Sequence, residues 1–181
     1  RRSSHGNAYF TGFGKTKRIV FFDTLLSRLN TAEIEAVLAH ELGHFKRRHV
    51  AKRIIWSFIM SLLFLWMLGY LMQQSWFYEG LGVSVASIPS TAKALLLFFL
   101  VMPVFTFLLQ PLSSLYSRKH EFEADEYAAH NASANDLTRA LVKLYRDNAA
   151  TLTPDPLHSA FYDSHPPAAI RIAKLQNLVL S

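Results

Sequence analysis

The chain contains two histidines and a glutamate in a spacing that suits a hydrolytic metal site. They lie in the segment His40-Glu41-Leu42-Gly43-His44. Residues four positions apart share one face of a helix, so His40 and His44 can hold one zinc ion. Glu41 would lie about 100° round that helix and reach a water on the metal as a general base. The motif therefore predicts a zinc hydrolase, and the alternative is a solvated helix that binds no metal.

A third protein ligand must come from elsewhere, because a catalytic zinc site takes three and leaves a position for water. The chain has no cysteine, so thiolate ligands are excluded. His49 follows the motif, but in a continuous helix it would lie about 140° from His44 and could not complete the site. Glu121 and Asp125 are four residues apart. One of these carboxylates can bind zinc while the other accepts a hydrogen bond from a ligand histidine.

Two long uncharged segments predict membrane-spanning helices. Residues 54–78 and 94–117 contain no charged side chain, and a helix that crosses a bilayer needs about 20 apolar residues. Pro103 and Pro111 lie in the second segment, which such helices tolerate. The alternative is a pair of buried helices in a soluble domain, but two segments of this length favour the membrane.

The distribution of basic residues favours a lipid bilayer as partner and not a nucleic acid. The formal net charge is +6, yet the positive side chains gather where the uncharged segments end, and the intervening loop 73–93 has few. By the positive-inside rule both outer ends lie in the cytoplasm, so the motif and the downstream carboxylates share one membrane face. The basic residues concerned are Lys46, Arg47, Arg48, Lys52, Arg53, Arg118 and Lys119.

Local patterns predict the remaining elements. Residues 7–22 alternate as a β-hairpin, and Asn30 with Glu33 forms a capping box that starts the metal helix. No proline interrupts residues 31–72, so this helix is expected to continue into the first span with at most a bend. The chain is expected to be one catalytic domain fragment, 1–181, of a longer protein that begins before Arg1. Its parts are a hairpin (1–30), an HExxH helix (31–53), the two spans, a third-ligand helix (113–132) and C-terminal helices (133–181).

The order of these features resembles one group of membrane peptidases. HExxH, two hydrophobic spans and the SRxxExxAD pattern of residues 117–125 are similar to the integral-membrane gluzincin zinc metallopeptidases. These include the type I CAAX prenyl endopeptidases of the Ste-twenty-four type and the more distant bacterial protease HtpX. Residues 2–26 and the Ser-His-Pro-Pro segment 164–167 are similar to the CAAX branch in particular. The resemblance covers nearly the whole chain, as that family's C-terminal catalytic part.

The resemblance implies a fold and a set of metal-site residues. The fold is mainly α: a membrane-embedded helical zincin with two transmembrane helices in this fragment and a small N-terminal β-hairpin. In the whole protein, the family's membrane helices form a ring round a chamber. His40, His44 and Glu121 are expected to bind one zinc ion, Glu41 to be the general base, and Asp125 to hold a ligand histidine. A surface salt bridge with Arg118 or Arg171 is the alternative for Asp125. Glu123 is expected to be solvated, and His49 to be a surface or core histidine.

The resemblance also implies where the substrate binds. The stretch around Asn7 and Ala8 is expected to hold the substrate backbone, and His165 to lie near the scissile carbonyl. A histidine before two prolines can instead simply cap the last helix. Residues 162–163 and Ile170 depart from the family pattern, which affects the local polar network and the substrate preference and leaves the zinc ligands untouched.

The expected function is that of an integral-membrane, multi-pass zinc metalloendopeptidase that hydrolyses peptide bonds with a zinc-activated water. Substrates would be membrane-associated peptides or proteins, through CAAX-box processing or quality control of membrane proteins. The alternative is an inactive scaffold or chaperone-like protein with a structural zinc, against which the intact Glu41 argues. Site-two proteases take a ligand from an Asp-Gly segment within a hydrophobic run, which this chain lacks. The bacterial inner membrane, with the active site towards the cytoplasm, is the expected location, and the endoplasmic reticulum the alternative.

Overall fold

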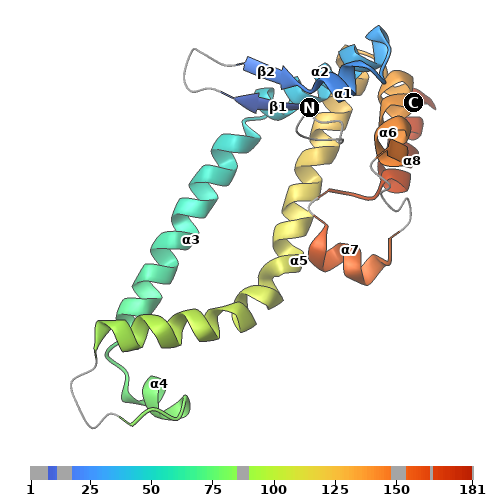
Figure 1. The fold of residues 1–181 in the computed structure, drawn as a ribbon. Helices are drawn as coiled ribbons and strands as arrows, with labels where there is room; N and C mark the ends of the chain where they lie inside the picture. The colour runs from blue at the N-terminus through green and yellow to red at the C-terminus, as the bar shows by residue number, and fades with distance from the viewer. Residues whose placement is uncertain (1–7, 12–17, 85–89, 148–153, 164, 181) are drawn as a thin grey trace. The chain divides into compact units, whose positions relative to one another are not determined.

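The computed structural model describes residues 8–11, 18–84, 90–147, 154–163 and 165–180. Within these ranges the chain forms two short strands and eight helices (Figure 1). The expected mainly helical fold, with an N-terminal hairpin and two long apolar helices, is confirmed.

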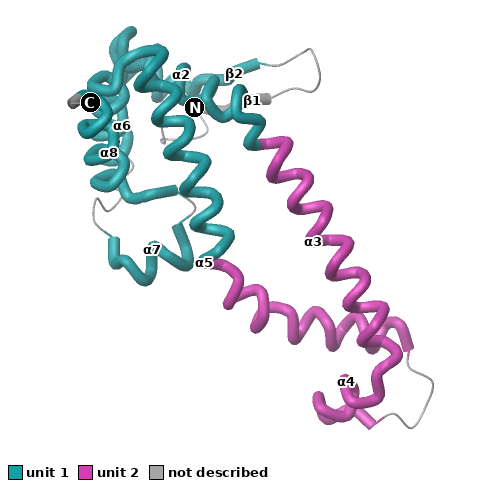
Figure 2. The backbone as a smooth tube through the Cα atoms, turned by 180° about the vertical axis from the view of Figure 1, so that it is seen from behind, with its two compact units in different colours: residues 1–49, 111–181 teal, residues 50–110 magenta. Residues whose placement is uncertain are grey.

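The chain divides into two compact units (Figure 2). One consists of residues 1–49 and 111–181, and the other of residues 50–110. Two helices, α3 (His49–Leu71) and α5 (Thr91–Asn131), are long and apolar enough to cross a membrane. The most apolar window of α3 has none of its residues buried in the described chain. Such exposure does not fit the core helix of a soluble domain, and it agrees with contact to lipid.

Helix α2 (Thr31–Lys46) begins at the predicted capping box and carries the HExxH motif. The Glu33 backbone N–H donates to Asn30 Oδ1 at 2.8 Å, and the Asn30 N–H donates to Glu33 Oε2 at 2.9 Å. These two bonds satisfy donors that the first turn of a helix otherwise leaves unpaired. Ala36 and Ala39 are buried in a core shared with other helices of the first unit. The start of α2 is therefore fixed locally, and its buried face is fixed by packing against other helices of the first unit.

The expected continuation of this helix into the first span is wrong. Helix α2 ends at Lys46 and α3 begins at His49. Between them Arg48 has φ 56°, in the left-handed region. A non-glycine residue there costs on the order of 1 kcal/mol, so the surrounding structure must hold it. Because no proline or glycine marks the break, the sequence pattern did not reveal it.

Helix α5 also differs from the expected boundaries. A separate third-ligand helix was expected from residue 113, but α5 is one helix from Thr91 to Asn131 with Pro103 and Pro111 inside it. Apolar helices accommodate proline by local adjustment of the backbone. The second apolar segment therefore leads directly into the turn that carries Glu121 and Asp125.

Three shorter helices also differ from the predicted elements. α1 (Asp23–Leu26), α4 (Ser75–Gly80) and α7 (Pro156–Tyr162) were not expected. Because α4 follows a break after Leu71, the first span ends there and not at residue 78. The Asp155 side chain caps α7 by accepting from two backbone N–H groups.

The C-terminal helices α6 (Ala134–Asp147) and α8 (Ala168–Leu180) join the core of the first unit. Helix α6 lies against both α2 and α8. Leu137, Leu141 and Leu175 form their common core. This packing brings α8 to the first unit's core, next to the helices that carry the motif and the downstream carboxylates.

The predicted hairpin is present at the N-terminus. Strand β1 (Ala8–Thr11) pairs antiparallel with β2 (Arg18–Phe21), and Ala8 lies opposite Phe21. Strand β1 also lies against α2. The sheet is thus beside the motif helix, while Asn7 falls outside the described residues.

Glu33 is expected to stabilise the first unit in a pH-dependent way. Its Oε2 accepts from Lys143 Nζ at 2.7 Å. Burial raises the pKa of Glu33, but the bonds with Lys143 and Asn30 outweigh it, and the pKa lies below its ordinary 4.5. The stabilisation is therefore present above pH 4.5 and is lost as the pH falls through the lower folded pKa.

Glu33→Gln should lower the free energy of unfolding by about 1–2 kcal/mol near pH 7 and flatten its fall below pH 5. Denaturant unfolding of the full-length protein in detergent measures both. Glu35→Gln, an exposed change on the same helix, is the control. Equal stability of the two variants would contradict the assignment.

Candidate metal centre

Two imidazole nitrogens of α2 face each other across a short gap. His40 Nε2 lies 3.2 Å from His44 Nε2. The HExxH spacing does this by putting both rings on one side of the helix, as the sequence predicted. Neutral histidine carries one lone pair and one N–H. Two ring nitrogens this close therefore need either a shared proton or a cation between them.

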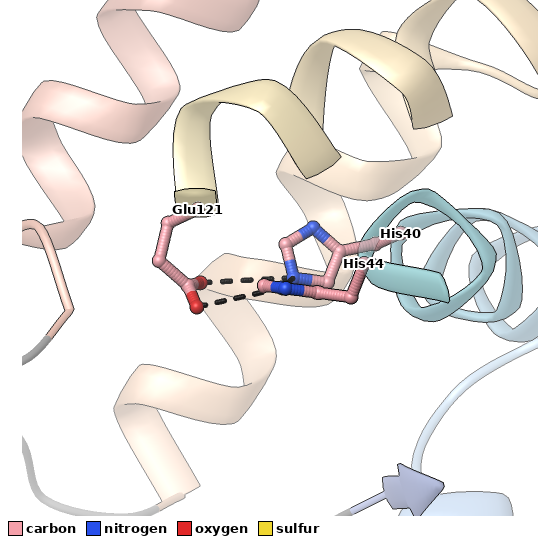
Figure 3. Close-up of side chains that lie close together, drawn as sticks. All are labelled: His40, His44 and Glu121. Carbon is pink, nitrogen blue, oxygen red and sulfur yellow. Dashed lines mark hydrogen bonds and ion pairs between the residues drawn. The ribbon is translucent and has the colours of Figure 1, made fainter. Parts of the chain in front are cut away.

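Glu121 of α5 brings a carboxylate to the same gap. Its Oε2 lies 3.6 Å from His40 Nε2, and its Oε1 lies 3.5 Å from His44 Nε2 (Figure 3). One donor atom from each of the three residues lies within 4.8 Å of the others. Tetrahedral zinc with bonds of about 2.0–2.1 Å holds its ligand atoms about 3.3 Å apart. The observed spacings therefore fit a zinc-sized cation.

Burial prepares the motif residues for this chemistry. Burial, with the nearby His40 and His49, lowers the pKa of His44 to about 3. The ring is then neutral at physiological pH and has a lone pair for a metal. Burial raises the pKa of Glu41, and the charge of Glu121 adds to this, which brings that carboxyl closer to the range of a general base.

Asp125 and Arg171 form a buried pair behind the ligands. Arg171 of α8 donates to both oxygens of Asp125, at 2.8 and 2.6 Å. Its Nη1 also lies 3.4 Å from Glu121 Oε2. Asp125 Oδ1 is 2.9 Å from His40 Nδ1, though the ring N–H is not aligned with it. Asp125 therefore contacts both a candidate ligand and an arginine. The alternative pairing with Arg171 is present, but the pair is buried and does not lie at the surface.

Of the remaining expected site residues, His165 lies beside the site. Its Nε2 is 3.4 Å from Glu121 Oε1, and its side chain is 63% exposed. The Tyr145 hydroxyl donates to the Pro166 carbonyl at 3.2 Å, which anchors this segment to α6. A cationic or donating group at His165 can thus reach a molecule bound beside the carboxylate. Of the pair expected to hold the substrate, only Ala8 is described, in β1 next to α2.

Three side chains near the site were not given a role from the sequence. Arg171 was weighed only as a partner for Asp125, although an arginine within an apolar helix is a sign of a buried partner. Glu123 was expected to be solvated, and His49 to be an ordinary surface or core histidine. His49 Nδ1 instead lies 3.0 Å from His44 Nδ1. Only the break at Arg48 allows this contact, and the break left no mark in the pattern.

Gly43 lets the two ligand-bearing helices approach each other. A Cβ added to Gly43 would lie 3.0 Å from the Ala124 Cα and 3.1 Å from the Ala124 carbonyl oxygen. Both are backbone atoms, so they cannot rotate out of the way. The glycine inside the motif therefore sets the distance between α2 and α5, and with it the gap that Glu121 spans.

The family follows from a match over nearly the whole length of the chain. Residues 1–179 match the peptidase family M48. The chain belongs to that family. It is 39% identical to CAAX prenyl protease 1 of Saccharomyces cerevisiae, over 97% of the chain and 42% of the yeast protein. It is 40% identical to the CAAX prenyl protease 1 homolog of Arabidopsis thaliana, over 94% of the chain and 40% of the plant protein.

The fold agrees with a solved member of the same group. The crystal structure of S. mikatae Ste24p superposes with a TM-score of 0.81 at 39% identity, over 96% of this chain and 42% of that one. The predicted resemblance to CAAX prenyl endopeptidases is confirmed. The chain spans less than half the length of these M48 relatives.

Gly43→Ala is expected to destabilise the first unit, because the added methyl group must push α2 away from α5. The cost should be about 1–3 kcal/mol. Gly69→Ala in α3 is the matched control, since its added Cβ meets nothing within 4 Å, and it should cost nothing. Denaturant unfolding of the metal-free full-length protein compares them, and a similar stability for both variants would refute the close approach.

Proposed function

We propose that the chain carries the catalytic centre of a membrane-embedded zinc metalloendopeptidase. The main support is the set of distances between His40 Nε2, His44 Nε2 and the Glu121 carboxylate oxygens, which suit tetrahedral zinc. The family membership supports the same reading, because His40, His44 and Glu121 all lie within the residues that match a peptidase family.

Each residue of the site would have a separate role in peptide hydrolysis. When bound, zinc supplies a water of lowered pKa and a positive charge for the carbonyl oxygen. Glu41 takes the proton of the attacking water and passes it to the leaving amine. His165, exposed beside Glu121, is positioned to donate to the developing oxyanion. Arg171 and Asp125 hold Glu121 and His40 in place.

We infer that the substrates are protein tails associated with the membrane. The relatives from yeast and Arabidopsis are named CAAX prenyl proteases, which favours a prenylated C-terminal segment. Strand β1 lies against α2, so an extended peptide could add to the sheet near the motif through backbone hydrogen bonds. Cleavage of a prenylated CAAX peptide but not of the same peptide without the lipid, by the full-length enzyme, would support this substrate. Equal cleavage of both, or of casein, would instead favour general quality control.

Glu41→Gln should abolish cleavage and leave zinc binding intact, because the amide cannot take a proton yet is not a ligand. A fall in kcat of at least about 10²-fold is expected. The full-length variant is assayed for peptide cleavage and for metal content. Undiminished cleavage would sink the proposed mechanism, while loss of the metal would mean that Glu41 is itself a ligand.

Glu121→Ala should release the metal, since two histidines alone leave the site a ligand short. The expected result is less than one tenth of the wild-type zinc content after dialysis, with no cleavage. Glu126→Ala, on the same helix, should retain both. If the Glu121 variant kept stoichiometric zinc, another residue would have to be the third ligand.

A further inference from the structure

Three polar side chains of the first unit, beginning with His44 of the candidate metal centre, contact one another in sequence. His44 Nδ1 lies 3.0 Å from His49 Nδ1. On the other side of the same ring, His49 Nε2 lies 3.0 Å from Glu123 Oε2. His44 is thus joined to a carboxylate of α5 through the full width of a second imidazole.

Only one placement of protons satisfies all three groups. His44 turns Nε2 towards Glu121, so as a neutral ligand it must carry its proton on Nδ1. That N–H can be donated only if His49 Nδ1 is unprotonated. The proton of His49 then sits on Nε2, where the Glu123 carboxylate accepts it. The opposite placement would set a ring lone pair of His49 against a carboxylate oxygen, which is repulsive.

The ring of His49 is held in the orientation that this placement needs. Its side chain is only 3% exposed. It stacks on His120, with ring centroids 4.0 Å apart and planes 7° from parallel. The left-handed residue Arg48 turns the chain between the two histidines; without that turn they would lie about 140° apart on one helix. The protein therefore maintains a strained backbone where it lets His49 reach His44.

We propose that His49 and Glu123 are positioning residues that fix the tautomer of His44 and so raise the zinc affinity of the site. This inference rests on the proposed zinc site. His40 has Asp125 directly behind it at 2.9 Å. His44 has the corresponding carboxylate one ring further away. Each histidine of the motif then has a carboxylate of α5 on its Nδ1 side, Asp125 in contact with His40 and Glu123 beyond the His49 ring for His44. Groups of this kind commonly change metal affinity by about 10–100-fold.

The test measures zinc affinity and metal-free stability separately in the full-length enzyme. His49→Phe keeps a ring to stack on His120 but offers no acceptor to His44. Its zinc Kd, from competition with a chelator, should rise about 10–100-fold. Glu123→Leu should weaken binding in the same direction. Glu123→Gln keeps a side-chain acceptor for His49 and should retain most of the wild-type zinc affinity. The melting temperature of each metal-free variant should stay close to that of the metal-free wild type.

Two controls separate this role from general packing. Lys119 lies 3.9 Å from Glu123 and is largely exposed, so Lys119→Met changes the charge near Glu123 without touching His49 and should leave the zinc Kd unchanged. The double variant His49→Phe/Glu123→Leu should bind zinc no more weakly than His49→Phe alone, because the carboxylate acts only through the ring. Additive losses in the double variant would overturn the proposal.

The outcomes also distinguish this inference from the proposed function. If the wild type binds zinc tightly and His49→Phe binds it equally well, only the role of His49 is refuted. If the wild type binds no zinc, both proposals fail. If His49→Phe does not fold, Glu123→Leu alone decides, since the Glu123 side chain is partly exposed. An unchanged zinc Kd in Glu123→Leu would refute the positioning role of His49 and Glu123.

Discussion

The close approach of α2 and α5 at Gly43 is the constraint on which the candidate site depends. The ligands come from segments of sequence far apart, and the carboxylate of Glu121 reaches the histidines only if the two backbones nearly touch. Glycine provides that contact against Ala124. A side chain at position 43 would push α2 away from α5. Because α2 also packs on α6, that movement would disturb this second contact as well. The motif therefore encodes ligand chemistry and helix spacing in the same five residues.

Charge balance gives a second argument for a divalent cation. Glu41, Glu121 and Asp125 bring three carboxylates to the site, and Arg171 brings one guanidinium. With neutral histidines the sum is two net negative charges. Excess charge of that size is costly in a site that is largely buried. A single zinc ion would cancel this excess, which agrees with the proposed metal site.

How far the sequence could predict this site depended on the range of each interaction. The Asn30–Glu33 capping box and the shared face of His40 and His44 follow from helix geometry alone, so they were predicted. Glu121 was reached through spacing, topology and family resemblance together. The role of Arg171 depends on how α8 packs, which no local pattern encodes. His49 was set aside because a continuous helix was assumed, and a left-handed arginine gives no warning in the sequence.

The continuity of α5 links the chemistry to the membrane. The uncharged segment of this helix ends at Ser117, and Glu121 follows after four residues. At about 1.5 Å per residue, the carboxylate lies only about 6 Å beyond the apolar run. His49 likewise opens α3 five residues before its own uncharged segment. Two separate stretches of chain thus place the candidate site roughly one helical turn from the ends of the uncharged segments. An enzyme built in this way would reach peptide bonds near a lipid anchor more readily than peptide bonds in a soluble domain. This agrees with the proposed substrate.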